Sequence, residues 1–252
     1  MIGRPKRLGR RVVRLLVPAA LGPAAIVLVA CAGSDGDTSS GAGPDVVTIE
    51  SQTCRRPQPR VGVGTVLADG VALTAAHVVD DQLRRLEIDG RAARVVAISA
   101  ATDLALVATE PSPDRTIEGA RRWFDTIEDA TPAPAGVSSV VTILAPDGDV
   151  PTTVERVVTL RVDDVSVGAV HERRALVLAA EVRSGDSGSP VVNGAGDVVG
   201  VVVLRRSDES SSYATRIPPL PNPTDLVADQ QRNPTYTGGS APESVAPTEP
   251  CT

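Results

Sequence analysis

Residues 183–192 have the sequence RSGDSGSPVV, which places Ser187 between two glycines, behind an aspartate and just before an apolar segment. Glycine has no Cβ, so Gly185 and Gly188 can adopt backbone conformations that are closed to other residues. Consecutive N–H groups can then point at one spot near the Ser187 hydroxyl, which is the geometry of an oxyanion hole beside a nucleophile. Taken alone, the stretch is equally compatible with a polar turn between two strands.

A serine hydroxyl is a weak nucleophile at neutral pH and needs an adjacent base, usually a histidine oriented by a buried carboxylate. The chain has two histidines. His77 follows a β-branched segment, 71–74, at a turn of small residues, whereas His171 lies among charged residues in GAVHERR and is expected at the surface. Asp103 directly precedes an apolar segment, a suitable place for a carboxylate kept out of water.

The order of these residues along the chain separates two scaffolds. An α/β-hydrolase has the motif G-x-S-x-G and places both partners after the serine, whereas here residue 189 is a serine and both partners come first. With TAAH at 74–77, DLAL at 103–106 and GDSGSP at 185–190, the sequence resembles the chymotrypsin-like (trypsin-like) serine peptidases over residues 46–217. Ser189 replaces the glycine usual in that family and no cysteine follows His77, but neither departure removes a catalytic group.

The resemblance implies a role for each residue. His77 is the general base, Asp103 orients it, Ser187 is the nucleophile, and the N–H groups of Gly185 and Ser187 form the oxyanion hole. The implied reaction is hydrolysis of peptide or protein substrates without a cofactor or a metal, and the histidines lack a metal-binding spacing such as H-E-x-x-H.

The alternative is a binding module with this fold, or an enzyme that needs a partner to order its site. Family zymogens are activated when a new N-terminus pairs with the aspartate before the serine, here Asp186, and the sequence contains no obvious activation site.

The resemblance also suggests a substrate pocket. In the family, the residue six positions before the nucleophile lies at the pocket floor, and an acid there selects Arg or Lys. That position is Glu181 here, and the pocket wall would include Val203 and Arg205. Arg205 could narrow the entrance or pair with Glu181, and the alternation of residues 179–182 could instead turn Glu181 outward. A small or aliphatic preference is therefore favoured over a basic one.

Short segments rich in Val, Ile and Leu, separated by turn signals, predict an all-β domain over residues 46–217. The expected strands are 46–50, 61–67, 71–74, 84–89, 92–98 and 104–108 in the first half, and 137–144, 150–167, 175–180, 190–192, 198–204 and 212–217 in the second. Asp-Gly pairs at 69–70, 89–90 and 147–148 suit hairpin turns. We expect two six-stranded antiparallel β-barrels of the chymotrypsin-like type, with the active site in the cleft between them.

Two segments outside the strands have their own signals. A proline-bearing connection, 111–136, separates the two halves, and its Trp123 and Phe124 are expected to cover an end of the core. Residues 218–252 form a Pro-rich C-terminal segment, in which Thr224 is expected to cap a short helix over 225–232, followed by a tail.

The first 30 residues contain six basic residues and no acidic residue, and they end in an apolar run. This pattern is typical of an export signal, by either the general or the twin-arginine route. The sequence LVAC at 28–31 resembles a bacterial lipobox, which implies cleavage before Cys31 and a lipid on its sulfur. The alternatives are an uncleaved anchor or plain secretion. Residues 31–45 are expected to be a flexible tether, with the protein held by its lipid on the outer face of the cytoplasmic membrane, in the cell envelope.

The cleaved chain would be acidic, because 19 of its 25 basic residues would remain against 31 acidic ones, a formal charge of −12. This charge argues against nucleic acid as a partner and against electrostatic binding to anionic lipid. Cys54 and Cys251 would be the remaining cysteines, an even number that predicts a disulfide in an oxidising compartment. Intermolecular pairing and free thiols are the alternatives. The sequence sets neither the oligomeric state nor the physiological substrate.

Overall fold

The computed structural model describes residues 43–54, 58–79, 83–164, 169–205 and 210–226. Contacts divide the chain into two units, Met1–Thr38 and Ser39–Thr252, and every described residue belongs to the second. The expected export signal, the lipidation site Cys31 and the tail with Cys251 lie outside the described residues. A bond between Cys54 and Cys251 therefore stays a prediction. No helix in the described part of the chain is long and apolar enough to cross a membrane.

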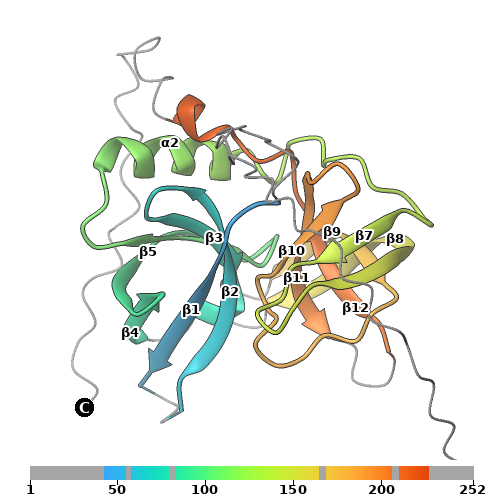
Figure 1. Ribbon diagram of the computed structural model, residues 1–252, viewed down its shortest axis with the longest axis horizontal. Coiled ribbons are helices and arrows are strands. Elements are labelled where there is room, and N and C mark those ends of the chain that lie inside the picture. The colour runs from blue at the N-terminus through green and yellow to red at the C-terminus, as the bar shows by residue number, and fades with distance from the viewer. Residues whose placement is uncertain (1–42, 55–57, 80–82, 165–168, 206–209, 227–252) are drawn as a thin grey trace, which may run out of the picture. The chain divides into compact units, whose positions relative to one another are not determined.

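The first barrel is closed and antiparallel, with the strand order β1-β2-β3-β6-β5-β4, and is drawn in blue to green in Figure 1. Its strands are β1 (Val46–Thr53), β2 (Arg60–Ala68), β3 (Val71–Ala75), β4 (Leu83–Ile88), β5 (Arg91–Ser99) and β6 (Leu104–Thr109). The expected Asp-Gly turns join β2 to β3 and β4 to β5. At the second turn both Asp89 and Gly90 have positive φ, as a two-residue hairpin turn of type I′ requires.

The second barrel is also closed and antiparallel, with the order β10-β11-β12-β9-β8-β7. Its strands are β7 (Val140–Ile143), β8 (Val150–Asp164), β9 (Ala169–Leu178), β10 (Pro190–Asn193), β11 (Val198–Arg205) and β12 (Ser212–Arg216). The expected fold of two six-stranded barrels is confirmed. The largest difference concerns β9, which begins at Ala169 and not at residue 175, so GAVHERR lies mostly within a strand.

Apolar packing joins the two barrels. One buried cluster lies inside the second barrel. A second fills much of the first barrel and takes in Val203 from β11. A third combines first-barrel strands with Val192, Val201 and Ile217 of the second half. Because the second and third clusters cross from one half to the other, the barrels are held as packed neighbours and residues from both can form one site.

The connection between the barrels holds a helix that the sequence analysis did not expect, α2 (Asp114–Asp125). Its buried positions recur at helical spacing, namely Thr116, Ile117, Gly119, Ala120 and Phe124. Phe124 belongs to the third cluster and Trp123 packs partly against it. The expectation that these two aromatic residues cover an end of the core is therefore confirmed.

The C-terminal segment returns to α2, and its helix begins at residue 223. The expected cap at Thr224 is wrong, because Asn222 Oδ1 accepts hydrogen bonds from the Thr224 N–H at 3.0 Å and the Thr224 hydroxyl at 2.6 Å. Asn222 is thus the capping residue. Leu226 is buried in the third cluster, and the expected end of the helix at residue 232 lies outside the described residues.

Candidate active site

Ser187 lies in the turn between β9 and β10, and its backbone is docked on the first barrel. The Val63 N–H of β2 donates a hydrogen bond to the Ser187 carbonyl oxygen at 2.8 Å. Gly188, the next residue, has φ of +92°, and a Cβ there would collide with the Val63 carbonyl oxygen. This position therefore requires glycine both for its conformation and for the close approach of β2.

His77 lies in a short helix, α1 (Ala76–Val79), that directly follows β3. Its Nε2 is 2.9 Å from Ser187 Oγ, and its Nδ1 is 3.0 Å from Asp103 Oδ2. Arg60 of β2 donates to the His77 carbonyl oxygen at 2.5 Å. The side chain of His77 is 39% exposed and that of Asp103 is 17% exposed, so the ring can meet a substrate while the carboxylate is shielded.

Asp103 is held by its backbone as well as by its side chain. Its φ is +57°, in the left-handed region, and its carbonyl oxygen accepts the Ala76 N–H at 2.8 Å. Its Oδ1 accepts the His77 N–H at 3.0 Å, which leaves Oδ2 to face the imidazole. The structure thus brings together the three residues singled out by the sequence, His77 and Asp103 from the first barrel and Ser187 from the second.

The loop before Ser187 is shaped by Asp186, which is buried. Its carboxylate accepts the Arg183 N–H at 2.6 Å. Its backbone N–H donates to the Arg183 carbonyl oxygen at 3.2 Å, and its carbonyl oxygen accepts the Ser189 N–H at 3.0 Å. In the described part of the chain, the N–H groups of Gly185 and Ser187 donate to no protein acceptor. Neither N–H group is therefore used by a hydrogen bond within this part of the fold.

The structure adds Arg173 of β9, which the sequence analysis did not single out. Its Nη1 is 3.4 Å from Asp103 Oδ2, and its side chain is 8% exposed. Burial lowers the pKa of Arg173, and the nearby Asp103 carboxylate partly opposes that change. Because side chains alternate along a strand, Arg173 shares a face of β9 with the buried Ala175 and Val177, opposite to Leu176 and Leu178 of the barrel core. His171, which was expected at the surface, is half-buried, and it pairs with Val162 on β8, outside the triad.

The residues expected in the substrate pocket are not all placed as the resemblance implied. Glu181 is exposed, between buried Ala180 and Val182. Val203 is 2% exposed and packs in the cluster of the first barrel. Arg205 ends β11, where its backbone pairs with Ser212. The burial pattern supports the alternative in which Glu181 points outward.

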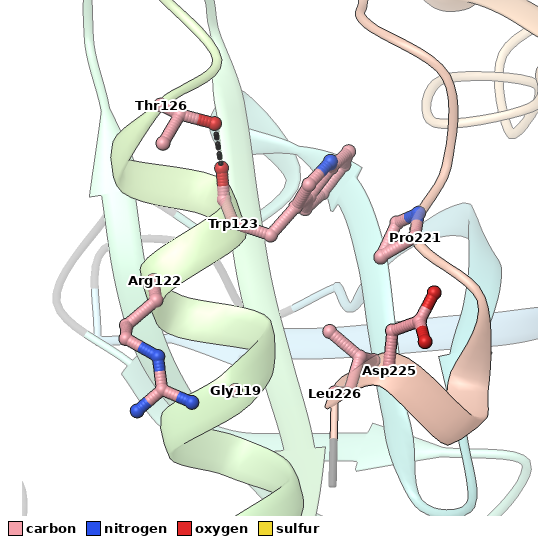
Figure 2. Close-up of a pocket in the computed structure, with 7 residues that line it drawn as sticks. All are labelled: Gly119, Arg122, Trp123, Thr126, Pro221, Asp225 and Leu226. Atoms are coloured by element: carbon pink, nitrogen blue, oxygen red, sulfur yellow. Dashed lines mark hydrogen bonds between the residues drawn. The ribbon is translucent and has the colours of Figure 1, made fainter. Parts of the chain in front are cut away.

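Figure 2 shows a hollow elsewhere in the protein, between α2 and the C-terminal segment, where Trp123 faces Pro221. Its lining consists of Gly119, Arg122, Trp123, Thr126, Pro221, Asp225 and Leu226. None of the residues singled out by the sequence for catalysis or substrate binding lines it. Within the described ranges, no group of three or more His, Cys, Asp and Glu residues could hold a metal ion.

Comparisons with known proteins agree with this geometry. A family model described as a trypsin-like peptidase domain matches residues 62–201, more than half of the chain. A search of the curated proteins found no match. Among solved structures, the active form of the Rv3671c protease from M. tuberculosis matches with a TM-score of 0.53 and 22% identity, over 82% of this chain and 87% of that one. At that identity, the match shows the fold alone.

The HtrA-type protease AlgW with a tripeptide matches with a TM-score of 0.48 and 16% identity, over 77% of this chain and 60% of that one. The family model carries the assignment, because its matched range contains His77, Asp103 and Ser187. On that match and the two-barrel fold, the chain belongs to the trypsin-like serine peptidases.

Proposed function

We propose that the protein is a serine endopeptidase of the bacterial cell envelope that hydrolyses peptide bonds through an acyl-enzyme on Ser187. The observation that carries the catalytic part of this proposal is the chain of contacts from Ser187 Oγ to His77 Nε2 at 2.9 Å and from His77 Nδ1 to Asp103 Oδ2 at 3.0 Å. The envelope location rests on the export-signal and lipobox pattern of residues 1–31. A nucleophile, a base and an orienting carboxylate are thereby in hydrogen-bond reach of one another.

The geometry supports the following sequence of steps. Ser187 Oγ attacks the carbonyl carbon of the substrate while His77 Nε2 accepts the hydroxyl proton, and Asp103 stabilises the imidazolium that forms. The N–H groups of Gly185 and Ser187 donate to the developing oxyanion, and each such donor typically contributes about 10² to 10³ in kcat. His77 then donates the proton to the leaving amine. Water, activated by the same ring, releases the acyl group and restores Ser187.

The competing function is a binding module, or an enzyme whose site a partner must order. Asp186 bears on this choice, because its carboxylate is already bound by the Arg183 N–H within the loop. The turn beside Ser187 can therefore hold its shape through local hydrogen bonds. This supports an enzyme that folds directly into its active form, without an activating cleavage or a partner.

Labelling with a fluorophosphonate tests the proposal directly. The reagent forms a covalent bond with an activated serine, so the native protein should be labelled and the Ser187→Ala variant should not. Ser189→Ala is a matched control, since it removes a buried serine hydroxyl from the same loop, and it should be labelled like the native protein. Failure of the native protein to label would favour the binding module.

The expected preference for the substrate side chain before the cleaved bond follows from the exposure of Glu181. An exposed carboxylate does not need a cationic partner, so it exerts little selection for Arg or Lys. Profiling of a peptide library should therefore give the same preference, for small or aliphatic side chains before the cleaved bond, in the native protein and in Glu181→Ala. A native preference for Arg or Lys that disappears in the variant would restore Glu181 to the pocket.

A further inference from the structure

Arg173 reaches out of the second barrel into the loop that carries Asp103. Its neighbours on β9, Glu172 and Arg174, are exposed, whereas Arg173 is 8% exposed. Its Nε donates to the Ala101 carbonyl oxygen at 3.0 Å, and its Nη2 donates to the Ala100 carbonyl oxygen at 3.0 Å. All three nitrogens of the guanidinium thus contact one short segment of the first barrel, since Nη1 approaches Asp103 Oδ2 at 3.4 Å.

A second side chain completes this attachment. The hydroxyl of Thr215, on β12, donates to the Thr102 carbonyl oxygen at 2.8 Å. Three consecutive carbonyl groups, those of residues 100–102, therefore accept hydrogen bonds from side chains of the second barrel. The next residue is Asp103, whose φ of +57° lies in the left-handed region, a backbone conformation that a residue other than glycine keeps only where its surroundings hold it.

Arg173 could act on the triad through its charge or through its geometry, and the sign of the electrostatic effect separates these two roles. A positive charge beside Asp103 offsets part of the negative charge that stabilises the imidazolium, so charge alone would not favour catalysis. The Oδ2 contact from His77 Nδ1 is 3.0 Å, against 3.4 Å from Arg173, so the histidine holds the closer hydrogen bond. The benefit of Arg173 must then come from geometry, because the planar fork fixes the carboxylate and two carbonyls at once.

We propose that Arg173 is a positioning residue that fixes the Asp103 carboxylate against His77 and so ties the geometry of the triad to the second barrel. This inference rests on the proposed function. A displacement of catalytic groups by about 1 Å can cost about 10²-fold in rate. Loss of the guanidinium should therefore lower kcat and leave KM almost unchanged, since Arg173 touches no substrate.

The test compares Arg173→Met, Arg173→Lys and the matched control Arg174→Met, with p-nitrophenyl acetate as a substrate that does not depend on the peptide pocket. We expect Arg173→Met to lose about 10- to 100-fold in kcat with KM changed by less than about threefold. Arg173→Lys should recover part of that loss, and Arg174→Met, which removes an exposed arginine from the same strand, should behave as the native enzyme. Native kcat in both Arg173 variants, or a change confined to KM, would overturn the proposal.

Two further measurements keep the result interpretable. If Arg173→Met does not fold, the Lys variant carries the test, with a fall in kcat expected and an unchanged kcat contradicting the proposal. The proton resonance of the His77 Nδ1 to Asp103 hydrogen bond should shift or broaden in both Arg173 variants and stay unchanged in Arg174→Met. This resonance needs no turnover. Failure of the native protein to label with the fluorophosphonate would overturn the proposed function. The role of Arg173 would then be decided by the resonance alone, and a resonance unchanged in both Arg173 variants would overturn that role.

Discussion

Single residues decide turnover, because Ser187, His77 and Asp103 act as a unit. Removing one member of such a set costs about 10⁴ to 10⁶ in kcat, and removing a second costs little more. We therefore expect His77→Ala and Ser187→Ala each to show near-background esterase activity, and the double variant to be no worse. His171→Ala should keep most of the activity, since His171 lies outside the triad. Loss of activity in a folded His171→Ala variant would contradict the assignment of His77 as the base.

Asp103 should matter for stability as well as for turnover, because it is the counter-ion of the buried Arg173. Asparagine keeps the size of the side chain and tolerates the left-handed φ, but it removes the charge. Breaking a buried ion pair typically costs about 3–5 kcal/mol, and the two carbonyl partners of Arg173 place Asp103→Asn toward the lower end of that range. Urea unfolding should show this loss in Asp103→Asn and almost none in Ser187→Ala. Equal stability of the two variants would mean that the pair contributes nothing to the fold.

The sequence motifs identified the triad because each of its residues lies in a short recognisable block. Arg173 could not be identified in the same way. It stands in a run of charged residues, HERR at 171–174, and such a run usually marks a solvated surface. Its burial is set by the alternation of β9 and by carbonyl groups about 70 residues away in the chain. Neither the length of the strand nor these distant acceptors can be read from the local composition.

At the scale of elements, α2 and the C-terminal segment meet at Gly119. A Cβ on Gly119 would overlap the backbone carbonyl of Leu226. Alanine favours a helix over glycine by about 0.8–1 kcal/mol, whereas overpacking in a close contact costs about 1–3 kcal/mol. We expect Gly119→Ala to lower the free energy of unfolding and to shift the emission of Trp123, the single tryptophan of the chain, to longer wavelength.

Arg115→Ala is the control for this substitution, because Arg115 is exposed on the same helix. It should leave the Trp123 emission unchanged. A Gly119→Ala variant that is more stable than the native protein would show that helix propensity outweighs the contact with Leu226, and that the C-terminal segment packs elsewhere.

The same elements show how far local patterns can predict this fold. Each strand carries its own β-branched residues and most turns carry their own glycines, so local patterns predict most strands within a few residues, whereas the start of β9 differs by six residues. Helix α2 was missed because prolines surround it and its capping position, Pro113, offers no side-chain hydrogen bond. The usual signal for the start of a helix is therefore absent. Its amphipathic pattern only becomes meaningful once the barrel end that it covers is known.

At the scale of the whole molecule, the site depends on barrel packing that no local pattern contains. Ser187 and His77 are separated by 110 residues in the chain and yet are hydrogen-bonded. Their contact requires two closed barrels, the apolar clusters that join them and the docking of Ser187 on Val63. From the sequence, this arrangement can be predicted only through the resemblance to a known family. Without it, the three motifs would have remained separate candidates.

The location of the whole protein should depend on Cys31 and not on charge. A chain cleaved before Cys31 would carry a formal charge of −12, which would oppose binding to an anionic membrane surface, so attachment would require the lipid. Acyl chains contribute about 0.8 kcal/mol per buried CH₂, and two or more chains hold a protein firmly where one chain does not. We expect the native protein to incorporate labelled fatty acid and to remain in the membrane fraction after a wash in high salt. Cys31→Ser should lose both properties, whereas the control Cys54→Ser should keep the label. Continued lipid incorporation in Cys31→Ser would show that the cysteine at 31 is not the anchor and that residues 28–31 are not a lipobox.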